Sequence, residues 1–486
     1  MIILGLNIVF TTDIDMSEHL TVRFNKPLYL IGIIFASVLI FFVCKYINDH
    51  LDHENEEKKR FRNLLLVLAI VIYASITILW VVIVRPNIVA DQIHTANLAQ
   101  TMFRGDPNEF LNNRTYLGIP LKKYIAAYPQ QITLAFIYSI FFRIIHFDEV
   151  PVLRGLNVIG AILMVIAIYK IMSQISKKYK TNKLLLSVLV LTYISIPMLT
   201  TFVYGDIPGL SLALWSVYFT MRLVDTKEIK YAIFSAICMS ISYMMRMNSL
   251  IFIIATAIYL GLNLINKFKE KELKEKIIQV AIIVAFIVIS IFPTTIVKNY
   301  YISKYGIEKG KDTPKANWIY IGMSEGPRAN GWYNDKIGGY GATHAEKAKQ
   351  EYPEKIKTRI KYFIQNPVYA IKFYGNKIAT MWTENTHAAT WYNSLKNNEF
   401  EKYRKPIEFY QKVLLIIICV CSLIFLIQNR KDLSLEVIFL ITIFIGGFVF
   451  HLIWEAKSRY IIPYIVVLFP IASINLKKFK FNKNKE

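Results

Sequence analysis

Residues 277–297, IIQVAIIVAFIVISIFPTTIV, contain no charged side chain, and stretches of this kind decide the fold. About 20 consecutive apolar residues form a helix that is long enough to cross a lipid bilayer. Similar stretches recur along the 486 residues, and 55% of all residues are hydrophobic. Soluble domains are only roughly 45–50% apolar. The sequence therefore predicts an all-α polytopic membrane protein.

About eleven transmembrane helices are predicted from these stretches. They cover residues 28–47, 62–84, 151–171, 183–203, 208–223, 231–247, 249–266, 277–297, 408–427, 433–453 and 460–476. A twelfth apolar stretch, 129–146, begins directly after Tyr128 and contains Arg143 and His146.

The links between the spans carry most of the information about orientation, because cytoplasmic links are enriched in Lys and Arg. The links near 170–183, 267–276 and 430–431 and the tail after 476 are all basic. They fall on one side only if 129–146 does not cross the membrane fully. We therefore expect 129–146 to be a juxtamembrane or re-entrant helix on the outer side of the cell membrane. The N-terminus is then outside and the C-terminus cytoplasmic.

This topology predicts three parts: an N-terminal transmembrane module (1–297) with a first outer loop (85–150), a large extracytoplasmic loop (298–407), and C-terminal helices with a basic tail (408–486). A long loop without a span is usually functional. The net charge of +23 is explained by lipid-facing links, and no nucleic-acid partner is expected. All four cysteines fall in apolar stretches, so we expect neither a disulfide nor a thiolate metal site.

Two acidic residues, Asp91 and Asp206, lie on the predicted outer side next to the ends of spans. Asp91 comes shortly after a span, where a carboxylate can act as a general base for a sugar hydroxyl. Its alternative role is to cap the following helix, 91–103. Asp206 lies between Gly205 and Pro208 in a very short link, and acids at membrane depth are functional candidates. Its alternative role is that of a simple turn residue.

Cationic residues on the same side oppose the orientation rule, which favours a role in binding an anion. Arg246 and Asn248 interrupt an apolar run, and a guanidinium there suits a phosphate group. A second cluster joins the last two spans and comprises Glu455, Lys457, Arg459 and Tyr460. The alternatives are a snorkelling Arg246 and a helical ion pair between Glu455 and Arg459.

The large loop contains Trp318, Arg328 and Trp332 among Asn, Tyr and Gly residues. Aromatic faces stack on sugar rings, and polar edges hydrogen-bond to them. Alternatively, these aromatic residues form the core of a small folded cap. The histidines of the loop have no companions at ligand spacing, so the pattern predicts no metal site.

The ordered set of an early outer acid, a second acid in a short link, a large outer loop and a terminal Glu-x-x-x-Arg-Tyr resembles the GT-C membrane glycosyltransferases. Within them it is most similar to the glycosyltransferase 39 group, which includes protein mannosyltransferases and aminoarabinose transferases. The resemblance covers most of the chain from about residue 62. Many relatives have adjacent acids in the first loop, whereas here Asp91 is followed by Gln92.

The resemblance implies a sugar donor carried on polyprenyl phosphate and an extracytoplasmic acceptor, which is a cell-wall polymer, a lipid or a protein. Asp91 would deprotonate the acceptor, Asp206 would shape the site, and Arg246, Lys457 and Arg459 would neutralise the leaving phosphate, with inversion. A divalent metal is an optional cofactor in this picture. Two alternatives remain: a polysaccharide polymerase or ligase that uses lipid-linked oligosaccharide, and a lipid or ion transporter.

Overall fold

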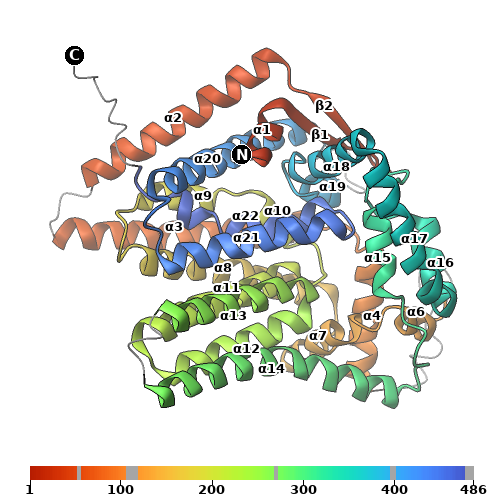
Figure 1. Cartoon of the computed structure of the whole chain (residues 1–486). Helices are drawn as coiled ribbons and strands as arrows, with labels where there is room; N and C mark the ends of the chain where they lie inside the picture. Colours follow the sequence, from red (N-terminus) through yellow and green to blue (C-terminus); the bar gives the residue numbers. More distant parts are fainter. Residues whose placement is uncertain (52–55, 106–118, 267–271, 395–400, 477–486) are drawn as a thin grey trace.

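The computed structural model describes residues 1–51, 56–105, 119–266, 272–394 and 401–476 (Figure 1). The basic residues expected on the cytoplasmic side at 267–271 and after 476 lie outside these ranges. Within the ranges the chain is almost entirely helical, and one hairpin of two strands is formed.

Eight of the described helices are long and apolar enough to cross a membrane, and shorter apolar helices accompany them. The predicted all-α polytopic membrane fold is therefore confirmed. The eight are α2 (Pro27–Leu51), α3 (Glu56–Ile83), α8 (Val150–Ile175), α11 (Asp206–Thr226), α13 (Leu250–Asn266), α14 (Leu273–Lys304), α20 (Glu401–Asn429) and α21 (Leu435–Ile453). The shorter ones are α7 (Gln131–Ile145), α9 (Lys183–Leu191) with α10 (Ser195–Leu199), and α12 (Ile229–Met245).

Two predicted spans are interrupted. The stretch 183–203 divides into α9 and α10, and 460–476 divides into the 3-10 helix η3 (Ser458–Ile461), α22 (Ile462–Val466) and α23 (Phe469–Ala472). Pro463 and Pro470 stand in the first turns of α22 and α23, where their missing N–H groups are tolerated. Inside one longer helix each proline would remove a hydrogen bond and clash with the preceding turn. Nearly all side chains of 461–474 are buried, as irregular backbone at membrane depth requires.

The segment between α3 and α8 begins and ends at the same end of the molecule. Arg154, near the start of α8, donates a hydrogen bond to the carbonyl of Pro86, just past the end of α3. Between them lie α4 (Asp91–Arg104), α6 (Leu121–Ala127) and α7, and Thr95 of α4 is bonded to Gln131 of α7 at 2.9 Å. The stretch 129–146 thus returns the chain to the end from which it came, which agrees with a juxtamembrane helix.

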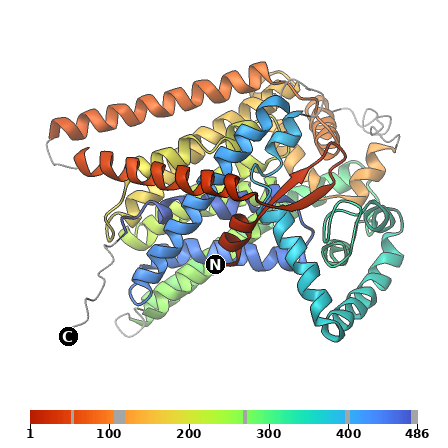
Figure 2. The same cartoon turned by 90° about the horizontal axis from the view of Figure 1, so that it is seen from above.

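Within its described residues, the large loop folds into five helices: α15 (Lys315–Gly322), α16 (Asp335–Thr343), α17 (Ala345–Gln365), α18 (Pro367–Trp382) and α19 (Ala389–Ser394). Its bounds are narrower than 298–407, because α14 continues to Lys304 and α20 already begins at Glu401. Seen from above, these helices lie at one end of the long helices (Figure 2).

The N-terminal segment packs against this loop. It consists of α1 (Ile2–Val9) and an antiparallel hairpin of β1 (Phe10–Ile14) and β2 (Leu20–Phe24). The N–H of Leu20 donates to the carbonyl of Arg328 at 3.0 Å, and the Asn7 amide donates to the carbonyl of Trp382 at 2.9 Å. The N-terminus and the large loop therefore share one end of the molecule, as the predicted topology requires.

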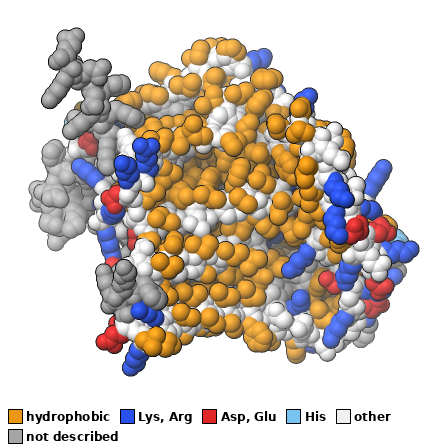
Figure 3. All heavy atoms as spheres, in the orientation of Figure 1, with side chains coloured by type: hydrophobic (Ala, Val, Ile, Leu, Met, Phe, Trp, Pro, Cys, Tyr) orange, Lys and Arg blue, Asp and Glu red, His pale blue; other side chains and the backbone are white. Residues whose placement is uncertain are grey.

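The opposite end gathers the basic links. Lys178 pairs with Asp432 at 2.6 Å, and the N–H of Asn475 donates to the carbonyl of Lys180 at 2.9 Å. Charged side chains collect at the two ends, with a band of hydrophobic side chains between them (Figure 3). This distribution is the one expected for a protein whose middle lies in lipid.

Candidate active site

Asp91 is the first residue of α4, and its carboxylate faces two tyrosines. Oδ1 accepts a hydrogen bond from the hydroxyl of Tyr124, and Oδ2 accepts one from the hydroxyl of Tyr204 at 3.1 Å. The cap residue of α4 is Ala90, with φ 51°, and no side chain caps the helix. The capping alternative for Asp91 is therefore wrong, and its side chain is available to the site.

Gln131 holds these tyrosines in place. Its Nε2 donates to the Tyr124 oxygen at 2.8 Å and to the Tyr204 oxygen at 3.3 Å. Burial and the charge of Asp91 raise the pKa of both tyrosines well above its ordinary value, so that both remain protonated donors. Sequence analysis missed all three residues, because Tyr204 lies 113 residues from Asp91 and only folding brings them together.

Gln92 follows Asp91 directly, at the position where the resemblance would lead one to expect a second acid. Its side chain is buried, and its Oε1 accepts a hydrogen bond from the N–H of Val203 at 2.8 Å. This bond ties the start of α4 to the link that carries Tyr204. The side chain of Gln92 thus makes a positioning contact in this structure.

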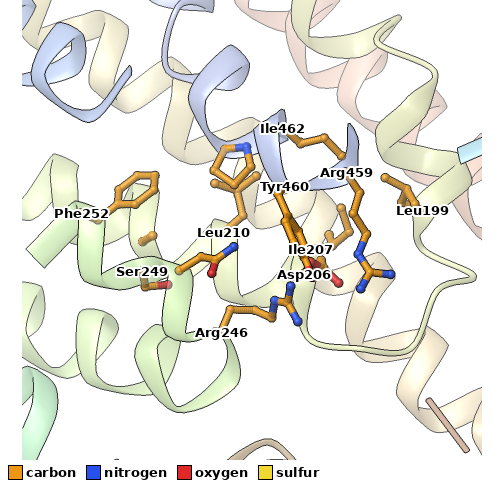
Figure 4. Close-up of a pocket in the computed structure, with 13 residues that line it drawn as sticks. Leu199, Asp206, Ile207, Leu210, Arg246, Ser249, Phe252, Arg459, Tyr460 and Ile462 are labelled. Carbon is orange, nitrogen blue, oxygen red and sulfur yellow. Dashed lines mark ion pairs between the residues drawn. The ribbon is translucent and has the colours of Figure 1, made fainter. Parts of the chain in front are cut away.

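Asp206 begins α11 and forms an ion pair with Arg246. Gly205 precedes it with φ +77°, a left-handed conformation that glycine adopts without strain. Arg246 ends α12 in an extended conformation, and its Nη2 lies 3.2 Å from Oδ1 of Asp206. The guanidinium also lies 4.8 Å above the ring of Tyr204. Asp206 is therefore a partner of a cation and not only a turn residue (Figure 4).

Arg459 is buried beside the same tyrosine. Its side chain is 8% exposed, and its Nη1 donates to the hydroxyl of Tyr392 at 2.5 Å. Its Cζ lies 4.4 Å from the ring centre of Phe202 and 5.5 Å from that of Tyr204. Within the described ranges it has no ion pair, and its Nε makes no hydrogen bond. An anion bound here would supply the missing partner.

The alternative in which Glu455 and Arg459 pair along one helix is wrong. The link 454–457 is not helical: Lys457 has φ −151° and ψ 139°, and Ala456 forms a parallel bridge with Trp332. Because residues four apart meet only on a helix, the two side chains are free to take separate positions.

Lys457 and Arg328 share a carboxylate from the N-terminal hairpin. Glu18 lies 3.1 Å from Nζ of Lys457 and 2.7 Å from Nε of Arg328, which also pairs with Asp335 at 2.7 Å. Burial alone would raise the pKa of Glu18, but the two cations lower it overall. Lys457, one of the three cations expected to neutralise the phosphate, and Arg328 of the large loop are thus already paired with protein carboxylates.

The two tryptophans of the large loop have different surroundings. Trp332 is 1% exposed, and its Nε1 donates to Thr380 at 3.0 Å, as expected for the core of a folded cap. Trp318 is half-buried, and its ring lies 6.3 Å from those of Tyr128 and Tyr333. Only Trp318 therefore keeps a surface that a sugar could contact.

Glu455 is a buried acid in the link that carries Lys457 and Arg459. Burial raises its pKa to about 7, although the neighbouring Lys457 and Arg459 lower it. The charges of Glu18 and, to a smaller extent, Asp91 add to the upward shift. A carboxyl group that exchanges its proton near neutral pH can serve a reacting sugar as donor or acceptor.

A cavity opens between α11, α13 and α22, next to the arginines (Figure 4). Its apolar lining comprises Leu199, Ile207, Leu210, Ala213, Phe252, Ile462 and Pro463. Its polar lining comprises Asp206, Arg246, Asn248, Ser249, Arg459 and Tyr460. Four of the predicted binding residues therefore line one cavity, together with Asp206.

No three His, Cys, Asp or Glu side chains of the described ranges gather closely enough to hold a metal ion. The site geometry that is present is therefore one of carboxylates, phenols and guanidinium groups. An optional metal cofactor stays a prediction of the resemblance alone.

No curated protein matches the chain. Residues 130–293 match the family model of dolichyl-phosphate-mannose-protein mannosyltransferase. This region contains Tyr204, Asp206, Arg246 and Asn248, whereas Asp91 and the cluster 455–460 lie outside it. Together with the helical membrane fold, the match confirms the resemblance to GT-C membrane glycosyltransferases of the glycosyltransferase 39 type.

Proposed function

We propose that this protein moves a sugar from a polyprenyl-phosphate donor to a hydroxyl group of an extracytoplasmic acceptor, with inversion at the anomeric carbon. One observation carries the proposal. The hydroxyl of Tyr204 donates to Asp91, and its ring lies 4.8 Å from the guanidinium of Arg246 and 5.5 Å from that of Arg459, which both line the cavity. One side chain thus contacts both the proposed base and the proposed phosphate site.

The arginines differ in their readiness to bind phosphate. Arg246 already has Asp206 as a partner at 3.2 Å, whereas Arg459 has no carboxylate partner among the described residues. A buried charge without a counter-charge is unfavourable, and a phosphate group would offset this cost with charge-assisted hydrogen bonds. The apolar side chains of Leu210 and Phe252 next to it suit the first isoprene units.

The proposed reaction is a direct displacement. The acceptor oxygen attacks the anomeric carbon from the face opposite the phosphate, and its proton passes to Asp91, which exchanges one tyrosine hydrogen bond for it. The bond between the anomeric carbon and the phosphate oxygen breaks, and its electron pair stays on that oxygen. The growing charge is stabilised by Arg246 and Arg459. A glycoside of inverted configuration and polyprenyl phosphate are the products.

The phosphate role is tested by Arg459→Gln in purified protein reconstituted in nanodiscs. A charge-assisted contact contributes roughly 1.5–3 kcal/mol, so transfer should fall by about tenfold or more, whereas Arg459→Lys should retain more activity. The readout is transfer of labelled sugar over a series of donor concentrations. The donor to use is the polyprenyl-phosphate sugar that accumulates in a strain lacking the protein.

Arg23→Gln is the matched control, because Arg23 is 51% exposed on the N-terminal hairpin and pairs only with Asp13. It should leave transfer unchanged. Unchanged donor kinetics in both Arg459→Gln and Arg246→Gln would exclude a phosphate role for the pair. A product with retained anomeric configuration would exclude the displacement in one step.

A further inference from the structure

The helices α17 and α18 meet in a bend that exposes large apolar side chains to the surroundings. We call residues 357–372 the elbow. Ile364, Val368 and Ile371 are 73%, 66% and 74% exposed, and Ile360 is 41% exposed. The fractions of Ile364, Val368 and Ile371 exceed that of Val284 on the span α14, which is 54% exposed. Single apolar side chains of the elbow are thus as exposed as those of a membrane span.

The exposed face of the elbow is distinct from its packed face. Phe363 and Phe373 turn inward and form a small core with Met323 of α15. Ile360 and Ile364 lie four residues apart on α17, and Val368 and Ile371 lie three apart on α18, so each pair shares one face of its helix. We call these four side chains the apolar stripe. They are distinct from the side chains of the small core.

The elbow lies beside the ends of the spans. Lys377 of α18 donates to the carbonyls of Leu452 and Trp454 at 2.9 and 2.7 Å, at the end of α21. From there α18 runs obliquely across the direction of the long helices, and the bend projects sideways beyond them (Figure 2). Val449 and Ile453, on the lipid-facing side of α21, are 54% and 44% exposed. The elbow therefore projects at the level where the lipid headgroups begin.

The charges of the elbow suit anionic lipid. Between residues 357 and 372 there is no Asp or Glu, and Lys361 and Lys372 are exposed on the two helices that carry the apolar stripe. Lys357 is also exposed, but it pairs with Glu354 at 2.6 Å. Interfacial helices combine an apolar face with flanking lysines, which extend their amines towards phosphate groups. We propose that the elbow is a membrane-interface anchor, whose apolar stripe enters the headgroup region of the outer leaflet of the bilayer that holds the spans.

The anchor has a structural consequence for the site. After α18 the chain enters a buried segment, 383–394, which carries Tyr392, the hydrogen-bond partner of Arg459. The elbow and Arg459 are therefore connected through α18 and this segment. The anchor itself does not depend on the proposed reaction, and its test uses no activity assay.

The test places a bimane fluorophore on Ile364→Cys in a protein whose four native cysteines are replaced by alanine. One copy per nanodisc, with anionic and doxyl-labelled lipids, excludes a second copy and any other protein as the occupant. We expect strong quenching by lipids labelled near the headgroup and weak quenching by iodide in solution. The control is Lys347→Cys, an exposed position at the far end of α17, which should show the reverse pattern.

Two results would overturn the proposal. Free access of iodide to residue 364 without lipid quenching would mean that the elbow stands in water. Shielding from iodide without lipid quenching would mean that protein covers the stripe. Changing Ile360 and Val368 to Ser in the labelled protein should reduce lipid quenching, whereas changing Thr358 to Ala on another face of α17 should not.

Discussion

At the residue scale, the role of Asp91 depends on what its carboxylate contacts. It accepts hydrogen bonds from Tyr124 and Tyr204 and caps no helix. Asp91→Asn keeps the size of the side chain but removes the proton acceptor. We therefore expect transfer to fall by roughly 10² to 10⁴, the usual scale of general base catalysis, while binding of the lipid-linked donor is retained. The rate of sugar transfer is measured at a saturating concentration of donor and a fixed concentration of acceptor.

Asp148→Asn is the matched control for this change, because Asp148 is also an acid of the first outer loop and pairs with Arg104 at 2.7 Å, away from the tyrosines. Transfer by this variant should stay close to that of the unchanged protein. Near-normal transfer by Asp91→Asn would assign the base to another group, with Asp206 the next to examine.

At the element scale, the N-terminal hairpin is joined to the site by Glu18. Glu18→Gln removes the counter-charge of Lys457 and one partner of Arg328. A charge-assisted contact contributes roughly 1.5–3 kcal/mol, so the variant should unfold at a lower temperature, as measured by loss of native fluorescence in nanodiscs. Asp15→Asn, an exposed change on the same hairpin that affects only local bonds to residues 17 and 19, should alter this temperature little.

The difference in unfolding temperature between the unchanged protein and Glu18→Gln should depend on pH. In the folded protein the pKa of Glu18 lies below its ordinary value of 4.5. The stabilisation is complete above the ordinary value and is lost as the pH falls through the lower folded value. The unchanged protein and Glu18→Gln should therefore differ most near neutral pH and converge in acid. A difference that stayed constant down to pH 3 would mean that the charge of Glu18 is not its source.

At the scale of the whole molecule, the basic links lie at one end and the large loop at the other. We therefore expect the end with Lys178 to be cytoplasmic and the end with the large loop to be outside. Cysteine at Lys178, which pairs with Asp432, should resist a membrane-impermeant reagent applied to intact cells. Cysteine at Gly339 should react, and this position is preferable to Gly338, where a Cβ would lie 2.5 Å from the hydroxyl of Tyr333. Permeabilised cells supply the control for Lys178. A reversed pattern would place Asp91 and the large loop in the cytoplasm.

The sequence by itself determined the membrane class and the positions of the long spans, and it named Asp91, Asp206, Arg246 and Arg459 as candidates. Apolar length and the side on which lysines collect are local properties, so they can be read without coordinates. Pro463 is also a local signal, because a proline breaks a helix. The continuous apolar stretch 460–476 nevertheless led to the prediction of one unbroken span.

Only the tertiary structure decided which of these residues lie close together. Tyr204 and Gln131 carry no local signal, and they meet Asp91 because separate helices converge on one end of the bundle. In the same way, Glu18 pairs with Lys457 from 439 residues away. Of the three cations expected to bind phosphate, only Arg459 then has no ion pair within the described ranges. The interaction between two charges depends on their distance in space. For residues far apart in the sequence, that distance is set by the folded chain and cannot be read from their positions in the sequence.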